Sequence, residues 1–259
     1  MKVGLIGYGK TGKLVAEEIL KDKSLTLEWV LKKSIEQAGM YASDLLGYED
    51  LSGKIYSIQN IDAVHFFDQH VVDVLIDFSS KNAMPIYPIA ADHGVRIVTA
   101  ISNYDQVQLL DLKKIGKKTA ILHSPNITLG INFLMGVAKS LQKIMPNADI
   151  EIVEEHFREK KGVSGTAVRI AKTLGLEGEN HINSIRAGGI VGKHEIIFGL
   201  QNQTIRLTHE SINRASFGEG AIYAAKWLIH RKRGFYSMED VLGFNEPDIT
   251  SSLPYQRIL

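Results

Sequence analysis

A histidine and several basic residues crowd the stretch VEEHFREKKGVSGTAVRIAKTLG, which runs from residue 153 to residue 175. His156 could donate a proton near neutral pH, and Lys160 could hold an anion. Ser164 suits a helix N-cap, which places the amides of Gly165 and Thr166 in a first turn where N–H groups lack partners. The segment fits a carboxylate-bearing substrate beside a proton donor. Residue types alone leave a second interpretation open, a solvated basic loop with a structurally bonded histidine.

A second candidate site is the glycine-rich turn GYGKTG, which follows a short apolar run at the N-terminus. Its glycines have the spacing G-x-G-x-x-G, which permits a tight turn, close approach of a pyrophosphate, and close packing of strand and helix. The first turn of the helix would offer free N–H groups to phosphates. The pattern predicts dinucleotide binding, and the alternative is an ordinary strand–helix turn. The residues concerned are Gly7, Tyr8, Gly9, Lys10, Thr11 and Gly12.

The end of the next strand bears on which dinucleotide binds. A site that prefers NAD usually carries a carboxylate there, which holds the ribose 2′-hydroxyl. In this chain the strand ends with Lys32, Lys33 and Ser34, which would attract a 2′-phosphate instead. The sequence therefore favours NADPH, with NADH also possible, and the alternative is a solvated strand end.

The elements that must position these groups alternate along the first 125 or so residues. Strand patterns at 1–6, 25–33, 72–80, 95–102 and 119–126 alternate with helix patterns at 13–21, 84–94 and 107–118. The run VDVLIDFSS is apolar until Asp77, as a strand buried on both faces should be. The alternation predicts an α/β fold with a Rossmann-like, doubly wound parallel sheet.

The pattern changes near Asn126. A long helix is expected at 131–144, a strand at 148–157, a helix at 164–175, several β-rich runs at 181–212, and a helix at 218–232. This order predicts a second, C-terminal α+β domain with a mixed or antiparallel sheet.

Composition narrows the function classes. The chain of 259 residues has a net charge of +1, which gives no electrostatic reason for nucleic acid as a partner. It contains no cysteine, so disulfides and cysteine-ligated metals are excluded. Asp68, His70 and Asp73 are too scattered to predict a metal site. With no leader pattern and no apolar run of about 20 residues, we expect a cytoplasmic protein without membrane spans.

Along nearly its whole length the chain resembles the bacterial 4-hydroxy-tetrahydrodipicolinate reductases (dihydrodipicolinate reductases) of the diaminopimelate–lysine pathway. The resemblance rests on an ordered series of motifs: the glycine turn, VLIDFSS, SPNITLGIN, the E-x-H-x-x-x-K…S-G-T-A segment, IRAGGIVGKHEIIFG and FGEGAIYAA. It implies that NADPH or NADH reduces a small cyclic dicarboxylate. It also implies a homotetramer formed through residues 127–233, with residues 1–126 and a returning tail, 234–259, forming the dinucleotide-binding domain.

The resemblance also implies roles for particular residues. His156 and Lys160 match the acid–base pair, and the turn at Ser164, Gly165 and Thr166, with Lys160, matches the substrate-carboxylate site. Three further segments match the nicotinamide and its ribose: Asp77, Phe78 and Ser79; Ala100, Ile101 and Ser102; and Ser124, Pro125, Asn126 and Ile127.

Three departures from the family pattern surround the substrate. Phe157 stands where the family has a second histidine, and Gly162-Val163 is one residue shorter than the family's D-A-P triplet. The loop at 100–103 reads A-I-S-N rather than G-T-T-G. Losing an imidazole donor could cost roughly 1.5–3 kcal/mol of binding, which Arg158 or Lys161 could offset.

Two other functions therefore stay open at this point. One is an NADP(H)-dependent reductase of another small imino or keto acid, and the other is a nucleotide-sensing protein that keeps the fold without catalysis. His194, in the run IRAGGIVGKHEIIFG, is interpreted as a structural or subunit-facing residue.

Overall fold

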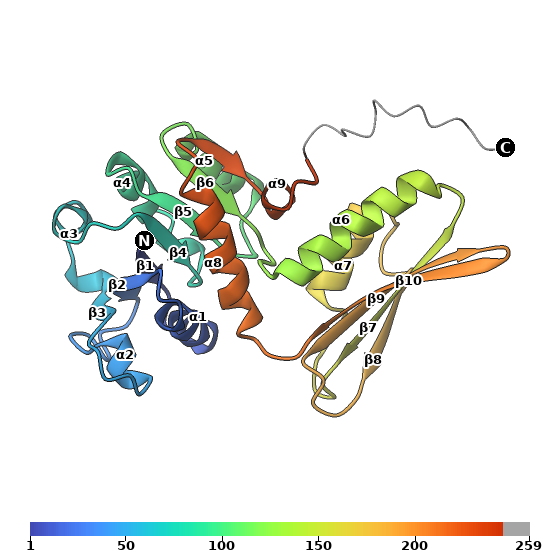
Figure 1. Ribbon diagram of the computed structural model, residues 1–259, viewed down its shortest axis with the longest axis horizontal. Coiled ribbons are helices and arrows are strands. Elements are labelled where there is room, and N and C mark those ends of the chain that lie inside the picture. Colours follow the sequence, from blue (N-terminus) through green and yellow to red (C-terminus); the bar gives the residue numbers. More distant parts are fainter. Residues whose placement is uncertain (246–259) are drawn as a thin grey trace.

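Two β-sheets organise the chain in the computed structural model, which describes residues 1–245 (Figure 1). The first sheet has seven strands in the order β11-β6-β5-β4-β1-β2-β3, and all of its pairs are parallel. The order 3-2-1-4-5-6 is that of a Rossmann fold, so the predicted α/β class is confirmed. The strands are β1 Lys2–Ile6, β2 Thr26–Lys32, β3 Lys54–Ser57, β4 Val74–Asp77, β5 Arg96–Thr99, β6 Ala120–His123 and β11 Gly234–Tyr236.

Helices cover both faces of this sheet, as a doubly wound fold requires. One hydrophobic core lies under α1 and α8, and the other lies under α3, α4 and α5. The apolar side chains of β4 are wholly buried between these layers, as expected for a central parallel strand. The helices are α1 Lys10–Lys21, α2 Ala42–Leu45, α3 Ala63–Gln69, α4 Ile86–Asp92, α5 Gln106–Ile115 and α8 Ser216–Leu228.

The second sheet has four strands in the order β10-β9-β7-β8. It is mixed, as predicted, because β7 pairs parallel with β8 whereas β9 runs antiparallel to both β7 and β10. Helices α6 and α7 pack on one face, and in the described range no helix covers the other (Figure 1). The elements are α6 Leu129–Ile144, β7 Asp149–His156, α7 Gly165–Thr173, β8 Ile182–Arg186, β9 Gly192–Leu200 and β10 Gln203–Ser211.

The chain crosses between the two sheets more than once. Helix α8 follows the second sheet but packs in the core of the first, where Ala221, Ala225 and Leu228 are fully buried. Strand β11 then joins the edge of the first sheet beside β6, and α9, Met238–Val241, lies against α6. The division into 1–126 with 234–259 and 127–233 stays a prediction, and its residues 246–259 lie outside the described range.

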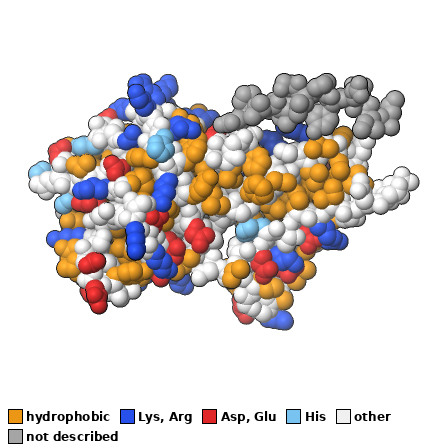
Figure 2. All heavy atoms as spheres, viewed as in Figure 1, with side chains coloured by type: hydrophobic (Ala, Val, Ile, Leu, Met, Phe, Trp, Pro, Cys, Tyr) orange, Lys and Arg blue, Asp and Glu red, His pale blue; other side chains and the backbone are white. Residues whose placement is uncertain are grey.

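The surface seen in Figure 2 mixes charges of both signs over the first domain, whereas hydrophobic side chains gather along α6. On α6, Phe133 is 57% exposed, and its ring packs against Phe244 with 5.9 Å between centroids. Of the helices in residues 1–245, none combines the length and the apolar character needed to cross a bilayer.

Candidate active site in the interdomain cleft

The glycine turn forms a cradle between β1 and α1. Gly7 has a φ of +99°, and a Cβ there would lie 2.8 Å from the Phe78–Ser79 backbone. A Cβ on Gly12 would collide with the carbonyl of Gly7, whereas one on Gly9 would meet nothing within 4 Å. The N-cap of α1 provides no side-chain hydrogen bond, so the first amides of this helix stay available to an anion. The turn therefore fits the pyrophosphate of a dinucleotide.

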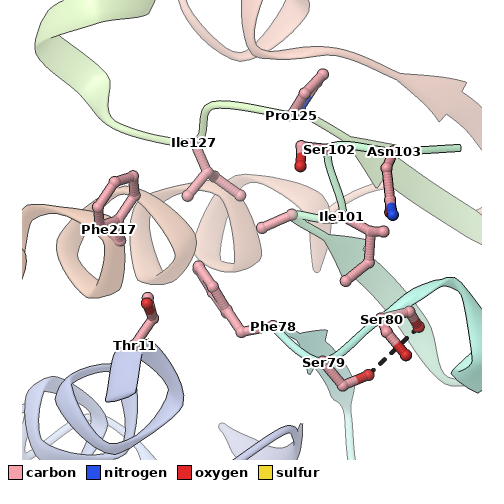
Figure 3. A pocket seen from close by; sticks show the side chains of 11 residues that line it. Thr11, Phe78, Ser79, Ser80, Ile101, Ser102, Asn103, Pro125, Ile127 and Phe217 are labelled. Atoms are coloured by element: carbon pink, nitrogen blue, oxygen red, sulfur yellow. Dashed lines mark hydrogen bonds between the residues drawn. The ribbon is translucent and has the colours of Figure 1, made fainter. Parts of the chain in front are cut away.

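A cavity of about 390 Å³ lies next to this turn, at the carboxyl ends of β4, β5 and β6 (Figure 3). The side chains of Phe78, Ile127 and Phe217 converge on it and give it apolar walls. Its position at the strand ends of a Rossmann sheet is where such folds bind the nicotinamide half of the cofactor. It is lined by Thr11, Phe78, Ser79, Ser80, Ala100, Ile101, Ser102, Asn103, Pro125, Ile127 and Phe217.

Asp77 lies beneath this cavity rather than on its wall. Its side chain is fully buried, accepts hydrogen bonds from the amide and hydroxyl of Ser79 at 2.7 Å each, and accepts one from Tyr87 at 2.6 Å. Burial raises the pKa of Asp77 to about 6, although these hydrogen bonds act in the opposite direction. The carboxyl group thus shapes the Phe78–Ser79 turn, while Tyr8 and Ser124, also buried, support the neighbouring segments.

A second cavity, of about 320 Å³, adjoins the first, since Thr11 and Phe217 line both. It brings together His156, Lys160 and Thr166, three residues that the sequence singled out. Its lining is Thr11, Asn126, Thr128, Ile131, His156, Phe157, Lys160, Thr166, Val191, Gly192, His194, Ser211, Asn213, Arg214, Ser216 and Phe217. A ligand in one cavity would therefore face a ligand in the other.

His156 reaches this cavity from the last position of β7. The strand alternates buried and partly buried residues, so Glu154 and His156 share its inner face. The Nδ1 atom of His156 is hydrogen-bonded to Glu154. Burial lowers the pKa of His156 below its ordinary value, and the positive charges of Lys160 and Arg186 act in the same direction, while Glu154 opposes them.

The turn before α7 differs in one respect from the expectation. Ser164 is the N-cap, and its Oγ atom accepts hydrogen bonds from Thr166 N at 3.2 Å and Ala167 N at 3.4 Å. The Thr166 amide is therefore partly engaged, while the exposed Gly165 N–H has no acceptor among residues 1–245. The hydroxyl of Thr166 accepts from Asn126 Nδ2 at 3.1 Å, which joins two residues that line the second cavity.

Some residues that the sequence singled out lie outside the two cavities, and some residues that line the second cavity were not predicted. Lys10 and Lys33 are exposed, and Lys32 Nζ donates to Gln37 at 2.9 Å. The end of β2 lies beside the glycine turn, since Gly7 N donates to the Leu31 carbonyl at 2.8 Å. Arg158 and Lys161 are exposed and do not line the second cavity. Arg214, which the sequence analysis missed, does line it, as do Phe217 and His194.

His194 lies beside both His156 and the N-cap of α7. Its Nε2 atom lies 3.0 Å from Ser164 Oγ, and its ring packs edge-on against that of His156 with 5.3 Å between centroids. Burial, followed by the charge on His156, lowers the pKa of His194 to about 4, so its imidazole is neutral at pH 7. Within the described part of the chain, no cluster of three or more His, Asp and Glu side chains is placed to hold a metal ion.

A Rossmann sheet with a phosphate cradle, an apolar cavity at its strand ends and an adjoining cavity with His and Lys side chains defines a two-domain, pyridine-nucleotide-dependent oxidoreductase. Family models cover both parts: residues 1–127 match "Dihydrodipicolinate reductase, N-terminus" and residues 130–242 match "Dihydrodipicolinate reductase, C-terminus". The chain belongs to the dihydrodipicolinate reductase family, and the predicted resemblance is confirmed.

Individual relatives agree with the family models. A 4-hydroxy-tetrahydrodipicolinate reductase of Methanosarcina barkeri is 31% identical over 94% of this chain and 99% of its own length. A reductase of the same name from Syntrophus aciditrophicus is also 31% identical, over 92% and 96%. The solved structure of a dipicolinate-bound dihydrodipicolinate reductase from Paenisporosarcina sp. TG-14 has the same fold, with a TM-score of 0.76, 22% identity, and coverage of 93% and 98%.

Proposed function

We propose that this chain is an NADPH-preferring 4-hydroxy-tetrahydrodipicolinate reductase that acts in the cleft between its two domains. The observation that carries the proposal is that the nucleotide-side cavity and the His156–Lys160 cavity adjoin through Thr11 and Phe217. Two reactants bound there would meet face to face, which replaces an encounter in solution with a fixed geometry. A dipicolinate-bound relative of the same fold is consistent with a cyclic dicarboxylate in the second cavity.

Each part of the cleft would have its own task. The first amides of α1 would hold the pyrophosphate, and Phe78 and Ile127 would flank the nicotinamide, which when bound supplies a hydride. Lys160 and the Thr166 hydroxyl, which line the second cavity, would hold a substrate carboxylate and stabilise developing negative charge, and the exposed amide of the neighbouring Gly165 would assist them. His156 would donate a proton through Nε2, because its Nδ1 atom is engaged by Glu154.

The decisive assay is NADPH oxidation by the purified full chain with the cyclic dicarboxylate, compared with monocarboxylate analogues of the same ring. We expect turnover only with the dicarboxylate. If only a monocarboxylate is turned over, the chain reduces a different imino or keto acid. If neither is turned over although NADPH binds, the nucleotide-sensing alternative replaces the proposal. A homotetramer and a cytoplasmic location stay predictions.

Coenzyme preference should depend on the lysines at the end of β2. We expect Lys32→Ala combined with Lys33→Ala to raise the KM for NADPH about tenfold, since roughly 1.5 kcal/mol of charge-assisted binding is lost. The KM for NADH should stay the same, because NADH has no 2′-phosphate to contact. Steady-state kinetics at low and high salt measure both effects, and Lys23→Ala, an exposed lysine beyond α1, is the control. Equal changes for both coenzymes would contradict the assignment.

Arg214 is our candidate for the second substrate carboxylate, in place of the histidine that Phe157 replaces. It lines the cavity just before α8, and its guanidinium has no hydrogen-bond or ion-pair partner among the described residues. We expect Arg214→Ala to raise the dicarboxylate KM by roughly 10- to 100-fold, and Arg214→Lys to recover part of it, since lysine keeps the charge but not the bidentate geometry. Arg158→Ala is the matched control outside the cavity. An unchanged KM in Arg214→Ala would refute the assignment.

A further inference from the structure

A carboxylate with no solvent exposure lies directly behind His156. Glu154 Oε1 accepts hydrogen bonds from Arg186 Nη2 at 2.5 Å, Ser184 Oγ at 2.6 Å and Ser164 N at 3.3 Å. Its Oε2 atom accepts from Arg186 Nη1 at 3.0 Å and is bonded to His156 Nδ1. Burial alone would raise the pKa of Glu154, but donors on Arg186, Ser184 and His156 outweigh it and hold the pKa at about 2. The carboxylate is therefore ionised.

This arrangement determines the protonation of the histidine. An ionised carboxylate can only accept hydrogen bonds, so Nδ1 of His156 must carry a proton. In the neutral imidazole the lone pair then lies on Nε2. That atom points toward Gly192, where a Cβ would lie 3.0 Å from it, and Gly192 lines the second cavity. The free nitrogen of His156 thus faces the place where a substrate would bind.

The same carboxylate is also linked, through Arg186, to the loop that carries Lys160. Arg186, whose Nη atoms bind Glu154, donates from Nε to the Lys160 carbonyl at 3.1 Å and from Nη2 to the Gly162 carbonyl at 2.6 Å. Glu154 therefore connects β7, β8, the Lys160 loop and the N-cap of α7. A simple charge partner for Arg186 would not need to contact His156 and Ser164 as well.

We propose that Glu154 is a positioning residue, which holds His156 in the tautomer with its proton on Nδ1 and its Nε2 directed at the substrate. Arg186 keeps the carboxylate charged and anchors the Lys160 loop to it. The role of this tautomer in proton donation rests on the proposed function, whereas the tautomer itself does not.

The first test measures the tautomer without any turnover. In the full chain with nitrogen-labelled histidine, NMR above the pKa of His156 should show Nδ1 protonated and Nε2 bare, with the signals assigned by their loss in His156→Asn. In Glu154→Gln the side-chain amide can donate to Nδ1, so the tautomer should reverse. A wild-type His156 that carries its proton on Nε2 would overturn the proposal, even if the enzyme were active.

The second test is kinetic. We expect Glu154→Gln to lower kcat on the order of 100-fold and to leave the KM for NADPH within about twofold. The donor is the imidazolium, which gives up its Nε2 proton and returns to the Nδ1–H tautomer, and the carboxylate of Glu154 stabilises both forms without contacting the nucleotide. Four charged or titratable groups face His156: Glu154 on β7, Lys160 in the loop, Arg186 on β8 and His194 on β9. Of these only Glu154 raises the pKa of His156, so its loss should move the basic limb of the kcat profile to lower pH.

The controls separate positioning from stability. Glu151→Gln alters a matched glutamate on β7 whose Oε1 lies 3.1 Å from His181 Nδ1, away from both cavities, and should leave kcat and the pH profile unchanged. Glu154→Asp keeps the charge and should keep the wild-type tautomer. If Glu154→Gln does not fold, the wild-type and Glu154→Asp spectra decide the question. A folded Glu154→Gln enzyme with kcat within threefold of wild type would refute the proposal, whereas an inactive wild type would refute only the proposed function.

Discussion

Replacing His156 with alanine is expected to lower kcat by roughly 10²- to 10⁴-fold, the usual contribution of a positioned acid–base group, while NADPH binds with wild-type affinity. The side chain lies at the wall of the second cavity, and none of its contacts involves the glycine turn or the nucleotide-side cavity. Glu154 would keep its bonds to Arg186 and Ser184 in the variant, so the fold should persist. Stopped-flow NADPH oxidation and fluorescence titration of NADPH measure the two quantities separately.

The pH dependence of wild-type kcat provides a second test of His156 as the proton donor. A proton donor must be protonated, so kcat should fall as pH rises through the pKa of His156. Burial lowers the pKa of His156 below its ordinary value, and Lys160 and Arg186 lower it further against the opposing effect of Glu154. This limb should be absent in His156→Ala. His181→Ala, which removes a half-buried histidine paired with Glu151 away from both cavities, serves as the control and should keep both kcat and the limb. If His156→Ala retains kcat within threefold, the proton comes from another group.

Hydrophobic periodicity predicted those strands and helices whose sequences carry a clear apolar pattern. The order of strands and helices from β4 to β10 agrees with the predicted segments because each has a continuous or alternating apolar pattern. Strand β3 and helix α3 were missed. Their signals are short, and tertiary contacts stabilise them. Phe66 and Phe67 of α3 pack against Trp29, with ring centroids 5.2 and 5.7 Å apart, and β3 pairs with β2. Strand β11, three residues long, depends on pairing with β6 and has no periodic signal of its own.

The site was predicted where local sequence determines local geometry. Ser164 is an N-cap, and His156 follows Glu154 on one face of β7, because capping and strand alternation act over a few residues. Arg214 and Phe217 were missed since they reach the cleft from a segment more than 40 residues beyond α7, and only the fold brings them there. A basic residue just before a glycine-rich helix start was the available signal. The buried position of Asp77 equally depends on Tyr87, ten residues along the chain.

Two glycines of the cradle should respond to the same substitution in different ways. A Cβ at Gly12 would collide with the carbonyl of Gly7, and backbone atoms cannot move aside as a flexible side chain can. We expect Gly12→Ala to destabilise the protein by about 1–3 kcal/mol through overpacking and to weaken NADPH binding strongly, because β1 and α1 must separate. Gly9 has a φ of −83°, which alanine adopts without strain, and a Cβ there meets nothing within 4 Å.

Gly9→Ala should therefore keep the wild-type stability to within about 0.5 kcal/mol and still raise the Kd for NADPH about tenfold or more, since the new methyl group occupies the space through which the pyrophosphate approaches. Urea denaturation and calorimetric titration of both variants measure stability and affinity independently. Gly94→Ala, at a glycine before the amino end of β5 with open space around it but a φ of +74°, shows what backbone strain alone does to stability without a change in affinity. If Gly9→Ala binds NADPH as tightly as wild type, the dinucleotide does not approach through this turn, and the adjoining cavities would need another explanation.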